Sequence, residues 1–196
     1  GAWFASAGGR TPAELGRDEG QLIVGIADSL RAAGIPIRSV SVGSTPTGWS
    51  AATVPGVTEI RPGTYVFNDL MQQRAGAATP DDVALAILCT VISRPSPTTL
   101  TVDGGSKTFC GDINYEKAGL PGYATVNGYP GALVRMSEEH GVVSFPEPVD
   151  IPVGSRIALT PIHVCTTINL SETAYFCDAT SGDCQPVTIR ARGKRT

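Results

Sequence analysis

Val83–Ser93, with the sequence VALAILCTVIS, is the stretch that decides the fold of the second half of the chain. It is apolar and rich in β-branched residues, which is typical of a buried β-strand. Short β-prone runs follow it, separated by turns that carry Gly or Pro, and helical periodicity is nearly absent. We predict further strands over residues 99–102, 132–138, 141–144, 156–161, 174–177 and 187–192. The second half of the chain should therefore be an all-β domain.

The residues before this strand show helical and mixed patterns instead. The run TPAE at 11–14 is typical of a helix start, and apolar residues recur at helical spacing over 22–33. Gly34 suits the end of this helix, because glycine tolerates the left-handed backbone that often follows a helix. A β-branched run over 35–42 then predicts a strand, and residues 43–47 predict a tight loop.

Two more strands, over 58–60 and 64–67, and a short helix over 68–74 are predicted to complete this part. A helix, a strand and a Gly-containing loop in this order form a βα unit of an α/β fold. One or two such units cannot cover both faces of a parallel sheet. We therefore expect residues 1–78 to be the end of a larger α/β domain whose start is missing, and residues 79–196 to be the β-rich domain.

The composition is that of an ordinary globular protein, since 41% of the 196 residues are hydrophobic and 17% are charged. A formal net charge of −3 argues against a nucleic-acid partner. No apolar run reaches the roughly 20 residues that a membrane-spanning helix needs. The five cysteines are an odd number without regular spacing, which favours the cytoplasm over secretion. A hairpin over 178–183 could still bring Cys177 and Cys184 together.

The loop GSTPT at 43–47 is a candidate anion site. Small residues let backbone amides approach a phosphate, and the hydroxyl groups add donors. The same residues are common in ordinary turns, so both interpretations stand. Tyr65, in EIRPGTYVFND at 59–69, could direct its hydroxyl at a phosphate or could belong to the core.

His163 and Cys165, in TPIHVCTT at 160–167, are a candidate metal pair. At the end of a strand, residues i and i+2 face the same side, so the two side chains could bind one ion. Imidazole and thiolate together favour Zn²⁺, and two protein ligands would leave positions for water or substrate, as in a catalytic site. A half-buried histidine beside a core cysteine is the alternative. The second histidine, in SEEHG at 137–141, could belong to a metal or proton-transfer cluster or to a charged hairpin edge.

The order of these motifs along the chain resembles one family. VSVGSTPT comes first, then EIRPGTYVFND, VDGGSKTFCGD, SEEHG and PIHVCTTINL, and IRARGK closes the chain. From about residue 32 to residue 194, this series resembles the D-serine dehydratase and D-threonine aldolase family. These are fold-type III, alanine-racemase-like enzymes that use pyridoxal 5′-phosphate (PLP).

The resemblance implies an α+β chain, with the final βα units of a PLP-binding (β/α)8 barrel followed by a mostly antiparallel β-barrel-like domain. It also implies a homodimer that acts on a small D-amino acid. The PLP phosphate would be bound by loop residues Gly43, Ser44 and Thr45 and would lie near Tyr65.

For the metal, the resemblance implies that His163 and Cys165 bind a divalent ion, with zinc favoured. The His-x-Cys form is similar to that of the eukaryotic-type D-serine dehydratases. The aldolases place a carboxylate shortly after the histidine, where this chain has Thr166 and Thr167. The implied reaction is dehydration of D-serine to pyruvate and ammonia, with retro-aldol cleavage as the alternative. Because both ligands must be deprotonated to bind a metal, activity should fall at acid pH.

The lysines of the chain depart from the family pattern. The family places the lysine that forms the Schiff base with PLP on an early barrel strand, and Lys107, Lys117 and Lys194 lie in no such context. No catalytic residue is therefore assigned in this chain. It is expected to be the C-terminal half of the enzyme, inactive alone and completed by an N-terminal half. A non-catalytic metal-binding β-domain is the alternative of another class.

Overall fold

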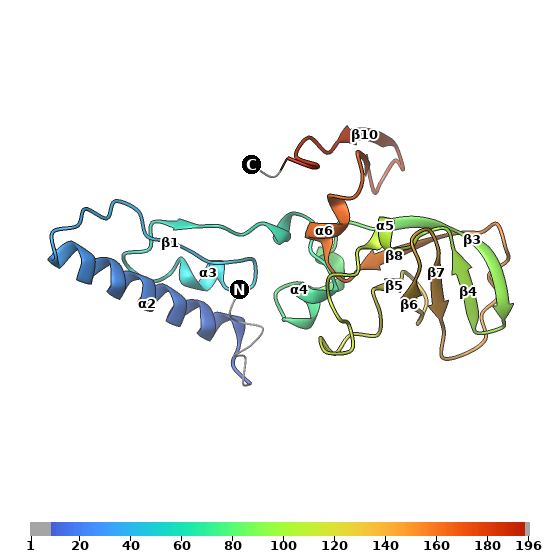
Figure 1. Cartoon of the computed structure of the whole chain (residues 1–196), viewed down its shortest axis with the longest axis horizontal. Helices are drawn as coiled ribbons and strands as arrows, with labels where there is room; N and C mark the ends of the chain where they lie inside the picture. Colours follow the sequence, from blue (N-terminus) through green and yellow to red (C-terminus); the bar gives the residue numbers. More distant parts are fainter. Residues whose placement is uncertain (1–8, 195–196) are drawn as a thin grey trace. The chain divides into compact units, whose positions relative to one another are not determined.

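The computed structural model describes residues 9–194, and the chain forms two compact units, residues 1–84 and 85–196 (Figure 1). The change in sequence character predicts the boundary near residue 78, somewhat earlier. The short 3-10 helix η2 (Pro80–Asp82) accounts for the difference. Asn68 donates its side-chain amide to the carbonyl of Asp82 at 3.0 Å, and the Ala84 amide donates to the carbonyl of Phe67 at 2.7 Å. These bonds hold the segment to the first unit.

The first unit is built on helix α2 (Pro12–Ala32), which confirms the predicted helix. Thr11 caps its N-terminus, and the side chains of Thr11 and Glu14 each bond the other's backbone amide, forming a capping box. The helix ends before Gly34, whose φ of +81° is the left-handed conformation expected there. Both ends of α2 are therefore set by local sequence signals.

The strand predicted over 35–42 is mostly wrong, because only β1 (Ser41–Val42) forms a ladder. It pairs in parallel with β2 (Glu59–Ile60), which is also two residues long. The backbone carbonyl of Ile37 accepts from the guanidinium of Arg31 and not from a neighbouring strand. The sheet of this unit is therefore limited by the short partner strand and not by the β-propensity of the run.

The strand predicted over 64–67 is also wrong, because Thr64–Val66 is a 3-10 helix, η1. The predicted short helix is confirmed as α4 (Leu70–Arg74), where the Asp69 side chain accepts from the amide of Gln72 at 2.9 Å. A further short helix, α3 (Gly48–Ala51), follows the 43–47 loop.

The second unit contains a closed six-stranded antiparallel barrel with the strand order β3-β4-β7-β6-β5-β8. Its strands are β3 (Ile87–Ser96), β4 (Thr99–Val102), β5 (Ala124–Val126), β6 (Ala132–Met136), β7 (Gly141–Ser144) and β8 (Arg156–Pro161). Leu100, Leu133 and Leu159 are fully buried in its core. The predicted α+β fold class is therefore confirmed. Nothing in the sequence analysis anticipated the three-residue strand β5.

Two kinds of element accompany the barrel in this unit, a pair of short helices and a hairpin. Two short helices, α5 (Ser106–Phe109) and α6 (Val164–Ile168), contact each other. A separate antiparallel hairpin is formed by β9 (Thr173–Cys177) and β10 (Cys184–Thr188), as Figure 1 shows. The last strand was predicted over 187–192 and lies earlier, because β10 begins where Cys184 pairs with Cys177. No helix within residues 9–194 is long and apolar enough to span a bilayer.

Candidate functional site

The loop 43–47 is tightly folded and requires glycine at its first position. Gly43 has a φ of +92°, and a Cβ atom there would lie 2.9 Å from the Cα of Gly48. The Gly48 amide donates to the carbonyl of Ser44 at 2.7 Å, which closes the turn. The loop lies between β1 and α3, as the sequence order predicts.

Glu19 of α2 is a residue at this loop that the sequence analysis missed. Its Oε1 accepts from the Gly43 amide at 3.1 Å, and its Oε2 accepts from the Thr47 hydroxyl at 3.0 Å. The Gly43 amide, which was expected to face a phosphate, therefore donates to a carboxylate of the same chain. No local motif marks Glu19, because the contact joins residues 24 positions apart.

Thr45 and Tyr65 are brought together, but not through the phenol. Thr45 is buried, and its hydroxyl oxygen accepts from the Tyr65 amide at 3.0 Å. Tyr65 is 47% exposed, and its ring packs edge-to-face against Trp49, with 5.9 Å between ring centroids. Tyr65 is therefore not a core residue, and its backbone, not its hydroxyl, holds Thr45.

His163 and Cys165 do not lie on a strand, contrary to the prediction. Strand β8 ends at Pro161, His163 precedes the first residue of α6, and Cys165 lies in the first turn of that helix. The carbonyl of His163 accepts from the hydroxyl of Thr167 at 2.7 Å, and that hydroxyl also lies 3.0 Å from the carbonyl of Phe109. The Thr167 hydroxyl therefore links α6 to the carbonyl of Phe109, the last residue of α5. The two side chains still interact through a hydrogen bond.

Asp112 completes the surroundings of His163, and the sequence analysis did not single it out. Its Oδ2 lies 2.7 Å from His163 Nδ1, and its Oδ1 accepts from the hydroxyl of Thr166 at 3.2 Å. The side chains of His163 and Asp112 are 27% and 33% exposed. With Nδ1 bound to a carboxylate, Nε2 is the nitrogen left for a metal, which is the usual arrangement of a metal-binding histidine. Asp112 is the last residue of the motif VDGGSKTFCGD, but nothing in that motif marks it as a partner of His163.

The electrostatics of this cluster favour a charged pair of His163 and Asp112. The hydrogen bond with Cys165 and the contact with Asp112 raise the pKa of His163 to about 9, although partial burial acts in the opposite direction. Burial acts to raise the pKa of Asp112, but hydrogen bonds from His163, Cys110 and Thr166 lower it overall. A metal ion at His163 would take the place of a proton, so metal binding and proton release are linked.

The donor set is that of an incomplete metal site. Within the described residues, no three side chains of His, Cys, Asp or Glu are grouped so as to hold an ion. His163 and Cys165 nevertheless offer an imidazole and an exposed thiol beside each other, with Asp112 orienting the imidazole. This set fits a divalent ion with open positions, such as zinc in catalytic sites.

The SEEHG cluster forms the turn between β6 and β7, and its contacts are those of a charged hairpin edge. The Ser137 amide donates to the carbonyl of His140 at 2.9 Å. Lys107 makes an ion pair with Glu139 at 2.5 Å. Glu139 is therefore used in surface pairing, and His140 contributes its backbone carbonyl to the turn.

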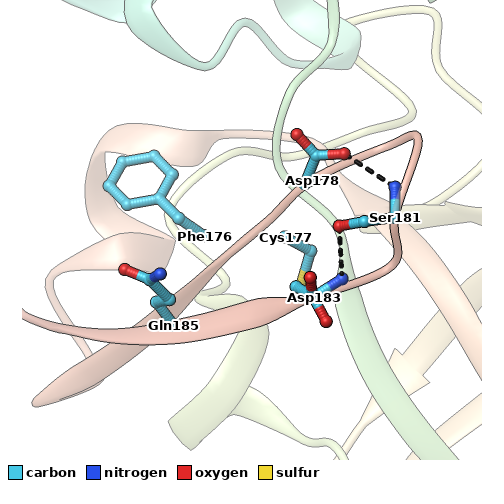
Figure 2. Close-up of a pocket in the computed structure, with 6 residues that line it drawn as sticks. All are labelled: Phe176, Cys177, Asp178, Ser181, Asp183 and Gln185. Atoms are coloured by element: carbon cyan, nitrogen blue, oxygen red, sulfur yellow. Dashed lines mark hydrogen bonds between the residues drawn. The ribbon is translucent and has the colours of Figure 1, made fainter.

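Cys177 and Cys184 form a disulfide across the β9–β10 hairpin. Figure 2 shows a pocket at this hairpin, lined by the disulfide residue Cys177 and by Phe176, Asp178, Ser181, Asp183 and Gln185. The Asp178 carboxylate accepts from the amides of Thr180 and Ser181, each at 2.8 Å, so it shapes the turn. The pocket contains no residue of the loop 43–47 and neither member of the metal pair.

Residues 84–177 match the family model described as “Putative serine dehydratase domain”. The D-threo-3-hydroxyaspartate dehydratase of Delftia sp. (strain HT23) is 36% identical over 156 residues, which is 72% of this chain and 41% of that enzyme. A D-threonine aldolase of Arthrobacter sp. and a D-serine dehydratase of Dictyostelium discoideum are 29% and 28% identical, and the matches cover 82% and 78% of this chain. The chain spans less than half the length of each of these three enzymes: 41% of the hydroxyaspartate dehydratase, 41% of the aldolase and 42% of the D-serine dehydratase.

An uncharacterised protein of Mycobacterium tuberculosis differs from these enzymes in length. It is 33% identical over 136 residues, which is 66% of this chain and 98% of that protein. Nearly the whole of this relative therefore corresponds to the chain.

The solved structure of the Delftia enzyme has a TM-score of 0.81 with this chain, at 31% identity, over 90% of this chain and 50% of the enzyme. Structures of two variants of that enzyme are also similar to this chain, one with a histidine and the other with a cysteine replaced by alanine. Their TM-scores are 0.80 and 0.79, each at 30% identity, and the matches cover 90% of this chain and 49% and 50% of the variants. The two positions are two residues apart, as His163 and Cys165 are, and the cysteine variant is described as metal-free. The chain belongs to the D-serine dehydratase and D-threonine aldolase family of alanine-racemase-like PLP enzymes.

Proposed function

We propose that the chain is the C-terminal half of a PLP- and metal-dependent lyase that dehydrates a β-hydroxy-D-amino acid, with D-serine or D-threo-3-hydroxyaspartate as the substrate. The observation that carries the proposal is the hydrogen-bonded group of Asp112, His163 and Cys165. Its His-x-Cys spacing equals that of the two substituted positions in the Delftia dehydratase, and the structure of the cysteine variant is described as the metal-free form. The carboxylate on His163 Nδ1 directs the other ring nitrogen to a metal, and zinc is the favoured ion.

The loop 43–47 supports binding of the PLP phosphate, with a change in the residues used. Gly43 provides the tight turn, while its amide is held by Glu19. Within residues 9–194, the amides of Ser44 and Thr45 donate to no other group. The Thr45 hydroxyl accepts from the Tyr65 amide, so its own proton is left for an anion. We therefore assign phosphate binding to the backbone amides of Ser44 and Thr45 and to the hydroxyl of Thr45. The backbone amide of Tyr65 positions this hydroxyl.

The residues of the chain divide the work of the proposed reaction. When bound, PLP would withdraw electrons from the Cα of the substrate, and the metal would act as a Lewis acid on the β-hydroxyl. His163 and Cys165 would hold the metal as imidazole and thiolate, and Asp112 would keep the imidazole oriented. Dehydration is favoured over retro-aldol cleavage because no carboxylate follows His163 at positions 164–167.

The proposed partners are an N-terminal half of the enzyme, the substrate and a second copy of the enzyme. The lysine that would hold PLP belongs to an N-terminal half, the substrate is a small D-amino acid, and the enzyme is a homodimer. No nucleic acid or membrane is part of it. We place the enzyme in the cytoplasm, where the reducing environment would keep the thiol of Cys165 available for a metal; the Cys177–Cys184 disulfide is a bond that is rare in that compartment.

The test uses the protein expressed from its complete gene, together with any residues that precede Gly1. It is supplied with PLP and zinc and then incubated with D-serine, D-threo-3-hydroxyaspartate or D-threonine. Ammonia and a 2-oxo acid in equal amounts support dehydration. Glycine and acetaldehyde from D-threonine instead assign retro-aldol cleavage. Bound zinc with no PLP absorbance and no product from any substrate contradicts the proposal and favours a non-catalytic metal-binding domain.

A further inference from the structure

Glu19 connects the two ends of the loop 43–47. Its two carboxylate oxygens accept from the amide of Gly43, the first loop residue, and from the hydroxyl of Thr47, the last. The side chain of Thr47 is buried, so its hydroxyl needs a partner inside the protein. One side chain therefore satisfies a donor at each end of the loop.

The reach of Glu19 depends on how closely α2 approaches α3. A Cβ atom on Gly16 would lie 2.3 Å from the backbone oxygen of Thr47, and one on Gly20 would lie 2.8 Å from Val54 Cγ2. Both distances are shorter than any carbon atom tolerates, so only glycine permits this packing. The two glycines flank Glu19 in sequence and bring its carboxylate to the loop.

The hydrogen bonds at Glu19 also decide which hydroxyl donates in the bond between Ser44 and Thr47. An ionised carboxylate only accepts, so the single proton of the Thr47 hydroxyl points to Glu19. The Ser44 and Thr47 hydroxyl oxygens lie 3.1 Å apart, and Ser44 must then be the donor. The proton of Ser44 is therefore used inside the loop, in a chain that runs from Ser44 through Thr47 to Glu19.

We propose that Glu19 is the positioning residue of the phosphate loop: it clamps Gly43 and Thr47 and turns the Ser44 hydroxyl inward, so that Thr45 is the one loop hydroxyl that donates to the phosphate. This inference rests on the proposed function, because it assumes that the loop binds the phosphate of PLP. It changes the expected role of Ser44 from hydroxyl donor to amide donor.

Glu19→Gln tests the direction of the chain. The glutamine oxygen can accept from the Gly43 amide while its NH₂ group donates to Thr47, which frees the Thr47 proton for Ser44 and the Ser44 proton for an anion. The same change removes a negative charge beside the loop. The variant should therefore keep the loop folded and bind inorganic phosphate more tightly than the unchanged chain does.

The decisive measurement is a double-mutant cycle with Ser44→Ala, in which ³¹P NMR titration of the full chain gives the dissociation constant of inorganic phosphate. In the otherwise unchanged chain, Ser44→Ala should alter this constant by less than about twofold. In the Glu19→Gln background, it should weaken binding about tenfold or more, the usual worth of a hydrogen bond to a charged group. Equal weakening in both backgrounds would mean that Ser44 donates to phosphate directly, which overturns the inference.

Amide hydrogen exchange without any ligand tests the clamp separately from phosphate binding. Glu19→Ala should speed exchange of the Gly43 amide about tenfold or more, with exchange in the middle of α2 as the internal reference for folding. Asp18→Asn is the matched control, because it removes the neighbouring charge on α2, whose partner is Arg10 at the surface. Unchanged exchange in Glu19→Ala overturns the clamp. If the unchanged chain binds no phosphate, the proposed function loses its phosphate loop, and this exchange measurement still decides the role of Glu19.

Discussion

At the scale of single residues, the contact between Asp112 and His163 decides how a metal would be held. An imidazole that is free to rotate presents either nitrogen, whereas a carboxylate on Nδ1 selects Nε2. Asp112 is itself held by the hydroxyl of Thr166 at 3.2 Å. The geometry of the metal pair therefore depends on a residue 51 positions away from the histidine.

Asp112→Asn should weaken zinc binding by about tenfold, toward the lower end of the effect of changing a residue that orients a metal ligand. The charge is lost while the volume and one acceptor oxygen remain. Competition with a chromophoric chelator measures the affinity. Asp150→Asn is the control, because Asp150 pairs with Arg94 at the surface and its side chain is 98% exposed. Equal zinc affinity in the two variants would show that Asp112 does not orient the ligand.

Cys89 provides a pH-dependent prediction inside the barrel. Burial, with a smaller contribution from Asp103, raises the pKa of its thiol to about 12. At pH 8 the folded chain should therefore alkylate with iodoacetamide at the exposed Cys165 and leave Cys89 unmodified. A raised pKa stabilises the fold fully below the unfolded value near 9, and this stability is lost as the pH rises toward 12. Mass spectrometry of the cysteine peptides at pH 8 checks the prediction, which fails if Cys89 reacts as fast as Cys165.

At the scale of secondary-structure elements, the packing of α2 on α3 depends on glycines that a helix would normally avoid. Gly16 and Gly20 lie on the face of α2 that meets α3, and both are buried. Gly25 lies on the same helix, and a Cβ atom there would meet nothing within 4 Å. Gly16 and Gly20 are therefore required by the close packing of the two helices, whereas Gly25 only lowers the helix propensity of α2.

Gly16→Ala should destabilise the first unit by about 1–3 kcal/mol, the usual cost of overpacking, because its Cβ would meet the backbone of Thr47. Gly25→Ala should instead stabilise the chain by up to about 1 kcal/mol, since alanine is the better helix former. Urea unfolding followed by far-ultraviolet circular dichroism measures both. Equal effects of the two substitutions would contradict the close approach of α2 and α3.

Local signals predicted some elements closely and failed where distant partners decide. The strands β4, β7 and β8 have the predicted residues, because each is an apolar run between turn residues. The run 35–42 has the same β-branched composition, yet only its last two residues find a strand partner. Composition reports the tendency to form a strand, and the pairing partner sets its length.

The site follows the same rule. The pattern His-x-Cys proposed the metal pair, but the strand geometry assumed for it was wrong, because β8 ends at Pro161 and α6 begins at Val164. Glu19 and Asp112 were missed since each acts through a contact with a residue far away in sequence. Spacing can propose ligands, whereas the residues that orient them become visible only in three dimensions.

At the scale of the whole molecule, the chain consists of two compact units with different parts of the proposed chemistry. The phosphate loop and Glu19 belong to residues 1–84, and the metal pair and Asp112 belong to residues 85–196. The chain spans about half of the solved dehydratase to which it is similar. The activity is therefore a property expected of the complete enzyme.

We propose above all that His163 and Cys165 hold the metal of a β-hydroxy-D-amino acid dehydratase. The measurement is the rate of 2-oxo acid formation by the complete protein with PLP, first after treatment with a chelator and then after addition of zinc. We expect the chelator to abolish the rate and zinc to restore it, whereas Cys165→Ala should remain inactive after zinc is added. Full activity of the chelator-treated protein, or of Cys165→Ala, would contradict the assignment.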